Sequence, residues 1–195
     1  LTKAESLFFK YGIKSISMDD LSRELGISKK TLYQSVENKK ELVIQVFQNL
    51  IQKEIDAVIS IRKDADDAID EMIEVARYVI PMLRQISPTL IFDIQKYYRD
   101  VWLLCEEFNQ QEVFTVIKEN IERGIKEGIY REEFHSEIIA KLYVGKTNLV
   151  IDEDIFPLKE YNKENLFKEH IQYHIRGIAT SKGLKLLEKH FKKLS

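Results

Sequence analysis

Residues Ser17–Val36 read SMDDLSRELGISKKTLYQSV, and this stretch decides the fold of the N-terminal part of the chain. Ser17, with Asp20 three positions later, forms a capping-box pattern that predicts the start of a helix. Gly26 follows that helix at a position where a left-handed backbone favours glycine. Ser28 then predicts the cap of a second helix. The pattern therefore predicts two short helices joined by a tight glycine turn.

The first turn of the second predicted helix is basic and rich in hydroxyl groups. It contains Lys29, Lys30 and Thr31, and no acidic residue occurs between Leu25 and Val36. A helix N-terminus carries unpaired N–H groups and partial positive charge, so it attracts phosphate, and two lysines strengthen that attraction. This arrangement is typical of a helix-turn-helix that binds DNA, although a serine-capped helix with two lysines also occurs on ordinary solvated surfaces.

The distribution of charge along the chain agrees with a local DNA-binding surface. The whole chain of 195 residues has a formal net charge of −2, which by itself does not indicate nucleic-acid binding. Residues 1–40 contain 8 basic and 5 acidic residues, a net charge of +3, whereas the remainder has 22 basic and 27 acidic residues, a net charge of −5. Because positive charge is concentrated at the start of the chain, we expect the nucleic-acid contacts there.

Residues 4–47 resemble the DNA-binding region of TetR-type (tetracycline-repressor-like) transcriptional regulators. The resemblance rests on four segments in a fixed order and spacing: Ala4…Leu7-Phe8…Tyr11-Gly12, Ser15-Ile16-Ser17-Met18-Asp19-Asp20-Leu21, Leu25-Gly26-Ile27-Ser28-Lys29-Lys30-Thr31-Leu32-Tyr33 and Asn38-Lys39-Lys40-Glu41-Leu42. Two positions depart from the usual pattern. Val36 stands where the family usually has phenylalanine, and Lys30 stands where it often has glycine. We expect Val36 to fill a slightly smaller apolar space and Lys30 to add charge near the duplex, with the fold unchanged.

The resemblance implies an all-α fold with two domains. A three-helix domain with the helix-turn-helix, residues 1–45, precedes a larger helical domain for effector binding and dimerisation, residues 46–195. The implied function is a DNA-binding regulator, more often a repressor than an activator, that binds a palindromic operator in double-stranded DNA as a homodimer. The predicted DNA contacts are Lys29, Lys30, Lys39 and Lys40 to phosphates, Ser17, Ser28 and Thr31 through hydroxyls, Tyr33 to the backbone and Gln34 to bases.

The remainder of the chain also reads as helices. Only three prolines and seven glycines occur in the chain, and alternation typical of strands is scarce. A fourth helix is predicted from Asn38 to about residue 61, and a fifth is predicted to be disturbed at Pro81. A long amphipathic helix is predicted from about Glu106 to Glu127, and a last one from Thr180 through Leu194.

Dimerisation is expected because one recognition helix reads too few base pairs for useful specificity. Two predicted helices, near residues 136–150 and 163–178, could supply half of a four-helix bundle across a two-fold axis. The candidate interface residues on them are Ile138, Leu142, Gly145, Leu149, Phe167, Ile171, His174 and Ile175. The alternative is that these side chains fill the core of their own subunit.

An aromatic-rich set in the central helices marks the effector pocket that the resemblance implies. Its members are Tyr78, Met82, Phe92, Tyr97, Tyr98, Trp102, Phe114 and Tyr143. Aromatic walls with a few polar tips suit a small aromatic or lipidic molecule. Aromatic residues at helical spacing are equally expected in an ordinary core.

The sequence offers little support for an enzyme, a metal site or a membrane anchor. His170 and His174 have the i, i+4 spacing of a zinc site but lack a third ligand nearby, and Glu132-Glu133-Phe134-His135 lacks the second copy that a di-iron bundle needs. We expect no catalytic residue, no metal and no cofactor. The single cysteine, Cys105, fits a cytoplasmic protein, and no apolar run could cross a membrane. Two alternatives stay open: a helical ligand-binding dimer without DNA control, and a helical metalloenzyme.

Overall fold

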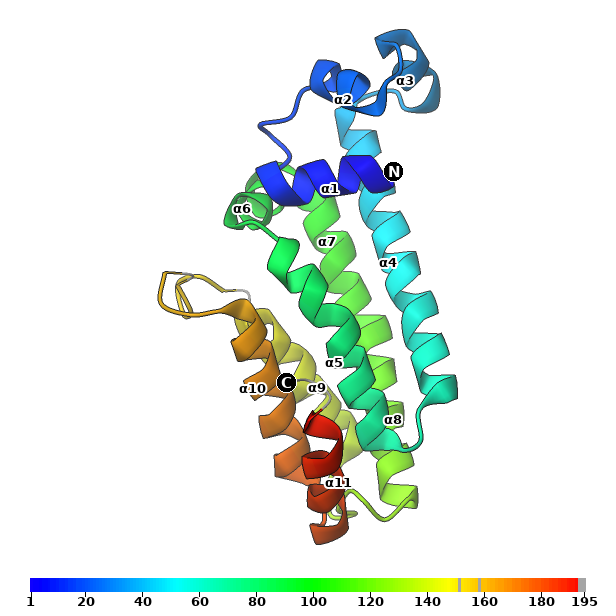
Figure 1. The fold of residues 1–195 in the computed structure, drawn as a ribbon, viewed down its shortest axis with the longest axis vertical. Helices are drawn as coiled ribbons and strands as arrows, with labels where there is room; N and C mark the ends of the chain where they lie inside the picture. The colour runs from blue at the N-terminus through cyan, green and yellow to red at the C-terminus, as the bar shows by residue number, and fades with distance from the viewer. Residues whose placement is uncertain (151, 158, 193–195) are drawn as a thin grey trace. The chain divides into compact units, whose positions relative to one another are not determined.

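The computed structural model describes residues 1–150, 152–157 and 159–192, and the regular structure in these ranges is helical (Figure 1). An isolated β-bridge joins Tyr130 and Ala179. The all-α prediction is confirmed. In chain order the helices are α1 (Thr2–Tyr11), α2 (Met18–Leu25), α3 (Lys29–Ser35), α4 (Lys39–Asp64), α5 (Ala68–Gln85), α6 (Pro88–Tyr97), α7 (Arg99–Phe108), the π-helical segment η1 (Asn109–Val113), α8 (Phe114–Lys126), α9 (Ser136–Val150), α10 (Lys163–Ile178) and α11 (Ser181–Phe191).

Three helices differ from the sequence predictions. Pro81 lies inside α5, which continues to Gln85. The predicted long helix from about Glu106 to Glu127 begins with the end of α7, is interrupted by the π-helical segment η1, and continues as α8. The last helix, α11, begins after the predicted cap Thr180 and ends at Phe191, and Leu194 lies outside the described residues. No helix among the described residues is long and apolar enough to span a bilayer.

The chain forms two compact packing units. The first contains Leu1–Ile55 and Gln85–Phe108, and the second contains Asp56–Arg84 and Asn109–Ser195. The helix α4 contributes residues to both units. These units describe packing and do not coincide with the predicted domains, residues 1–45 and 46–195, because α6 and α7 group with the N-terminal helices. The predicted domain division stays a prediction.

The core of the first unit joins α1 to α4 and α6. The rings of Phe9 and Phe47 pack with centroids 6.4 Å apart. Gly12 ends α1 with a φ of 79°, and a Cβ there would lie 2.6 Å from the methyl carbon of Thr89 in α6. The N–H of Ser87, the cap of α6, donates to the Phe9 carbonyl at 3.1 Å. These contacts fix α6 against the helix that precedes the helix-turn-helix.

The core of the second unit gathers apolar side chains from α5, α8, α9, α10 and α11. Tyr130 is buried there and packs directly on Gly124, where an added Cβ would lie 2.1 Å from the tyrosine ring. The Tyr130 hydroxyl lies 3.3 Å from Asn120 Oδ1, and the Asn120 amide donates to the Ala68 carbonyl at 2.8 Å. The buried tyrosine therefore requires glycine at position 124.

Candidate DNA-binding site

Paired hydrogen bonds fix the start of α2. The N–H of Asp20 donates to Ser17 Oγ at 3.1 Å, and the N–H of Ser17 donates to Asp20 Oδ2 at 3.0 Å. The predicted capping box is confirmed. The hydroxyl and N–H of Ser17 lower the pKa of the Asp20 carboxyl, because both hydrogen bonds favour its charged form. The first helix of the motif is therefore held at its N-terminus by its own sequence.

The turn and the second cap also follow the sequence pattern. Gly26 adopts a left-handed conformation, with φ 69° and ψ 27°, and its N–H donates to the Arg23 carbonyl. The N–H of Thr31 donates to Ser28 Oγ at 3.0 Å, which caps α3. The predicted pair of helices joined by a glycine turn is confirmed (Figure 1).

The helix α3 has one buried side and one exposed side. Leu32 and Val36 are buried, so valine fills the apolar position that the family usually gives to phenylalanine. Six predicted contact residues gather on the exposed part of α3 and its cap: Ser28, Lys29, Lys30, Thr31, Tyr33 and Gln34. The Tyr33 side chain is 43% exposed. The structure thus presents a basic, hydroxyl-rich helix N-terminus to a ligand.

Lys29 is held by an exposed ion pair. Its Nζ lies 2.7 Å from Asp19 Oδ1, and both side chains are largely exposed. The hydrogen bond to Asp19 raises the pKa of the Lys29 ammonium, which is charged at neutral pH. An exposed ion pair is weak because water solvates both charges, so a DNA phosphate can replace the Asp19 carboxylate beside Lys29. The pair positions the lysine without removing it from the surface.

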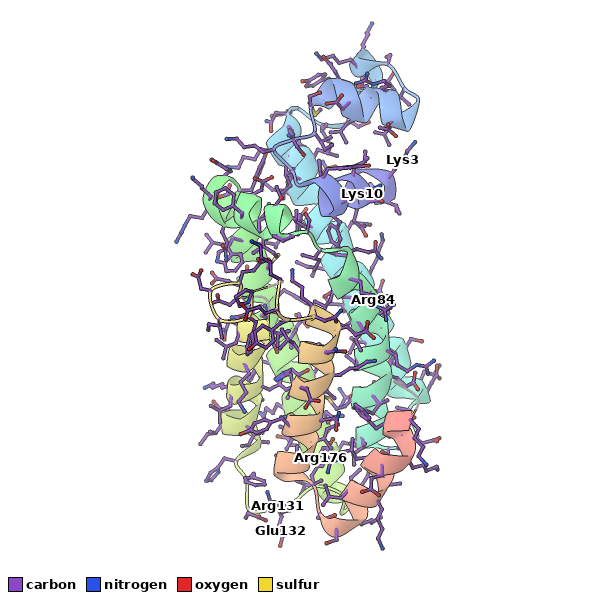
Figure 2. The ribbon with its side chains drawn as sticks, turned by 60° about the vertical axis from the view of Figure 1, so that its left-hand side comes forward. Lys3, Lys10, Arg84, Arg131, Glu132 and Arg176 are labelled. Atoms are coloured by element: carbon purple, nitrogen blue, oxygen red, sulfur yellow. The ribbon has the colours of Figure 1, made fainter. Side chains whose placement is uncertain are left out.

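Lys39 and Lys40, at the start of α4, have contacts of their own in the structure. Lys39 is half-buried and its Nζ donates to the Ile13 carbonyl at 2.5 Å; burial lowers the pKa of its ammonium. Lys40 forms an ion pair with Asp100 of α7. Lys39 is therefore used to hold the loop between α1 and α2. Lys3 of α1 (Figure 2), which the sequence analysis did not single out, donates to the Glu24 carbonyl at the end of α2.

Comparison with known proteins identifies the motif. The family model "Bacterial regulatory proteins, tetR family" matches residues 1–46. The N-terminal region of the chain is therefore similar to the DNA-binding region of TetR-family transcriptional regulators. It is 25% identical over 150 residues to the HTH-type transcriptional regulator YvaF of Bacillus subtilis, covering 74% of this chain and 75% of that protein. The TetR family consists of bacterial regulatory proteins, which argues against the metalloenzyme alternative.

Solved structures share this fold at low sequence identity. A transcriptional regulator from Cytophaga hutchinsonii superposes with a TM-score of 0.73 at 17% identity, covering 92% of this chain and 96% of that chain. A protein from Saccharomonospora viridis, crystallised in complex with choline, gives a TM-score of 0.71 at 15% identity, covering 92% and 95%. The likeness in fold extends over the C-terminal helices as well as the helix-turn-helix.

The predicted pocket residues are divided between the two packing units. Tyr98 and Trp102 are half-buried in the first unit, and Phe92 and Tyr97 are exposed there, by 51% and 43%. The remaining four belong to the second unit: Tyr78, Met82, Phe114 and Tyr143. Neither unit brings the whole set together. The exposure of Phe92 and Tyr97 runs against their placement in an enclosed pocket.

Tyr143 lies in a buried cluster with two histidines of α10. Its ring centroid is 4.6 Å from that of His170 and 4.9 Å from that of His174. Burial lowers the pKa of His170 to about 4 and that of His174 to about 3, so both are neutral at pH 7. Across the described ranges, no three His, Cys, Asp or Glu side chains gather as a metal site.

The predicted dimer-interface residues fall into two groups. Four are exposed along one side of α9 and are called the α9 stripe: Ile138, Leu142, Gly145 and Leu149. The other four lie on α10 and are buried in their own subunit: Phe167, Ile171, His174 and Ile175. Because these α10 side chains already pack inside the subunit, they are not available to a partner. In the structure, the α10 group therefore lies in the core of its own subunit, as the alternative interpretation of the sequence expected.

Proposed function

We propose that this protein is a homodimeric TetR-family repressor that binds a palindromic operator and releases it when a small effector binds. The observation that carries the proposal is the combination of an exposed, basic α3 with an exposed apolar stripe on α9. The first feature suits phosphate and base contacts, and the second suits a second copy of the chain. Together they provide the parts that a two-fold symmetric DNA-binding protein requires.

The α3 helix supports DNA binding through three kinds of group. Its capped N-terminus offers backbone N–H groups and partial positive charge to a phosphate. Lys29 and Lys30 add charge-assisted contacts, which carry no sequence information. Gln34 is exposed on the same short helix and can form a bidentate contact with an adenine. Its replacement should therefore change sequence preference more than total affinity for mixed DNA.

The α9 stripe supports self-association. Ile138, Leu142 and Leu149 are 55%, 52% and 43% exposed, and they recur at the spacing of one helical face. Gly145 lies among them with open space where a Cβ would be, so a partner backbone can approach closely. Clustered exposed apolar side chains of this kind indicate an interface. An isologous contact would use the stripe twice, once from each subunit.

The long helix α4 offers a route between effector and DNA. Its 26 residues begin two positions after Glu37, near the helix-turn-helix, and run into the second packing unit. An effector that favours one arrangement of the dimer changes operator affinity by its differential affinity for the two arrangements. A small aromatic or lipidic effector is supported by the aromatic content of α5–α9, and a small-molecule effector in general by the choline bound to the structurally similar protein from Saccharomonospora viridis.

The proposal is tested with operator DNA selected from a random-sequence duplex library by the full chain. Tyr33→Ala should abolish measurable shift of the selected duplex, because it removes an exposed group of α3. Leu142→Glu should yield a monomer in sedimentation velocity at micromolar concentration, and weaken operator binding at least about tenfold through loss of the second half-site. Ile59→Glu is a matched control, since Ile59 is an exposed aliphatic residue of another helix. A wild-type monomer that binds the operator would contradict the dimer.

A further inference from the structure

A second basic and aromatic surface lies beside the helix-turn-helix, within the same packing unit. It is formed by exposed residues at the end of α1, in the loop that follows, and in α6, and is called the α6 patch: Lys10, Tyr11, Lys14, Phe92, Lys96 and Tyr97. The three aromatic side chains are 47%, 51% and 43% exposed, in the order Tyr11, Phe92, Tyr97. Lys10 is labelled on α1 in Figure 2.

The lysines of the α6 patch lie over its aromatic rings. Lys14 Nζ is 3.7 Å from the Tyr97 ring centroid, and Lys96 Nζ is 4.9 Å from that of Phe92 and 5.3 Å from that of Tyr97. The two rings meet edge to face, with centroids 6.0 Å apart. Hydrogen bonding from Lys14, and then from Lys96, lowers the pKa of the Tyr97 phenol. The ammonium groups are thus ordered by the rings while staying exposed to solvent.

Buried contacts hold the patch in place against α1. The N–H of Lys14 donates to Asp93 Oδ2 at 2.7 Å, and Asp93 is only 2% exposed. The close approach of Gly12 to Thr89 adds a second link between the loop and α6. Lys14 lies three positions before Ser17, the cap of α2. The patch is therefore continuous with the motif that binds DNA.

The chemistry of the α6 patch fits the phosphate backbone. The nearby carboxylates already have partners: Asp93 is buried and accepts a hydrogen bond from the Lys14 N–H, and Asp100 forms an ion pair with Lys40. The lysines interrupt the apolar area, so a purely apolar partner would have to bury their charges. A polyanion gains from each of them by releasing counterions. Charge complementarity and continuity with the helix-turn-helix both favour DNA as the occupant.

We propose that the α6 patch binds the phosphates of DNA flanking the operator, outside the base pairs that α3 reads. This inference rests on the proposed DNA-binding function and extends it to a second contact surface. The contacts carry no sequence information, so they strengthen binding to an operator within long DNA without changing the preferred sequence. Because the aromatic rings already order the lysine side chains, less side-chain conformational entropy is lost when DNA binds.

The test compares two duplexes that carry the same selected operator. The short duplex ends at the operator, and the long one adds about 10 base pairs, one helical turn, on each side. The variant Lys14→Gln/Lys96→Gln should bind the short duplex as the wild type does and bind the long duplex about tenfold more weakly near 0.1 M salt. On the long duplex, the slope of log affinity against log salt should become shallower by about 0.9 for every phosphate that the variant no longer neutralises.

Three further variants separate the outcomes. Lys185→Gln/Lys189→Gln in α11 makes the same change in net charge elsewhere and should leave both duplexes unaffected. Lys14→Arg/Lys96→Arg keeps the charges and should restore binding to the long duplex. If the Gln variant matches the α11 control on the long duplex, or loses affinity equally on both duplexes, the α6 patch proposal is overturned. Loss of binding by Tyr33→Ala in the same assay keeps the proposed function intact in either case, whereas a wild-type protein that binds neither duplex overturns both.

Discussion

Acidification should destabilise the second packing unit through His170 and His174. Both imidazoles are buried against Tyr143, and the His174 Nε2 atom has no hydrogen-bond partner. Desolvation by burial is the main cause of their low pKa values; the charge of His170 lowers the pKa of His174 further, and the charge of Lys146 lowers both. In the unfolded chain the imidazoles are solvated and titrate near pH 6.5. The folded state therefore binds fewer protons than the unfolded state at mildly acidic pH.

The size of this effect follows from the separation of the pKa values. The pKa of His170 falls from 6.5 to about 4 and that of His174 to about 3, so both stay largely neutral in the fold at pH 5. Stability then decreases as the pH falls below 6.5, and each histidine contributes about 2 kcal/mol of loss between pH 7 and pH 5. The pair contributes about 4 kcal/mol, a large part of the stability of an ordinary domain.

Urea unfolding at pH 7 and pH 5, at one protein concentration, measures this contribution. The double variant His170→Gln/His174→Gln should lose about 4 kcal/mol less than the wild type between the two pH values. His135→Gln is the matched control, because His135 is exposed, and it should follow the wild type. The single variants should each show about half the difference, which keeps the test available if the double variant folds poorly at pH 7. Equal losses for the wild type and the histidine variants would refute the reasoning.

Two other substitutions probe the local packing of each unit. Gly124→Ala places a methyl group 2.1 Å from the Tyr130 ring and should reduce the free energy of unfolding by about 1–3 kcal/mol. Gly177→Ala is the control: the space at Gly177 is open, so this variant should not lose stability by overpacking. Urea unfolding followed by near-ultraviolet circular dichroism measures both variants. Ser28→Ala removes the cap of α3 and should reduce the free energy of unfolding by about 1 kcal/mol. It should also weaken binding to every DNA sequence. Unchanged DNA affinity at all salt concentrations would contradict the role given to the α3 N-terminus.

The local features of the helix-turn-helix could be predicted from sequence because their partners are close along the chain. Ser17 and Asp20, or Ser28 and Thr31, are three residues apart, so the hydrogen bonds form within one helical turn. Lys39 could not be predicted in the same way. Its ammonium reaches the Ile13 carbonyl, 26 residues earlier, and only the packing of α1 beside α4 brings the two together.

Whether an apolar helical face is buried in the subunit or exposed was predicted less well. Helices α9 and α10 both carry regular apolar spacing, but the residues predicted for the interface are exposed on α9 and buried on α10. Periodicity identifies a face, and the neighbouring helices decide whether that face turns inward. Phe92 and Tyr97 show the converse case, since aromatic residues expected in a pocket lie at the surface under lysines.

The π-helical segment η1 has a consequence for how insertions and deletions would act in this chain. It lies directly at the boundary between the packing units, which falls between Phe108 and Asn109. A π-helical turn accommodates an additional residue within a continuous helix, and one residue corresponds to a rotation of about 100° in a regular α-helix. Removing a single residue from η1 would therefore let this segment close as regular α-helix and leave Ile117 and Ile121 of α8 on their buried side, whereas removing a residue from α8 just before Ile117 would turn that side by about 100°.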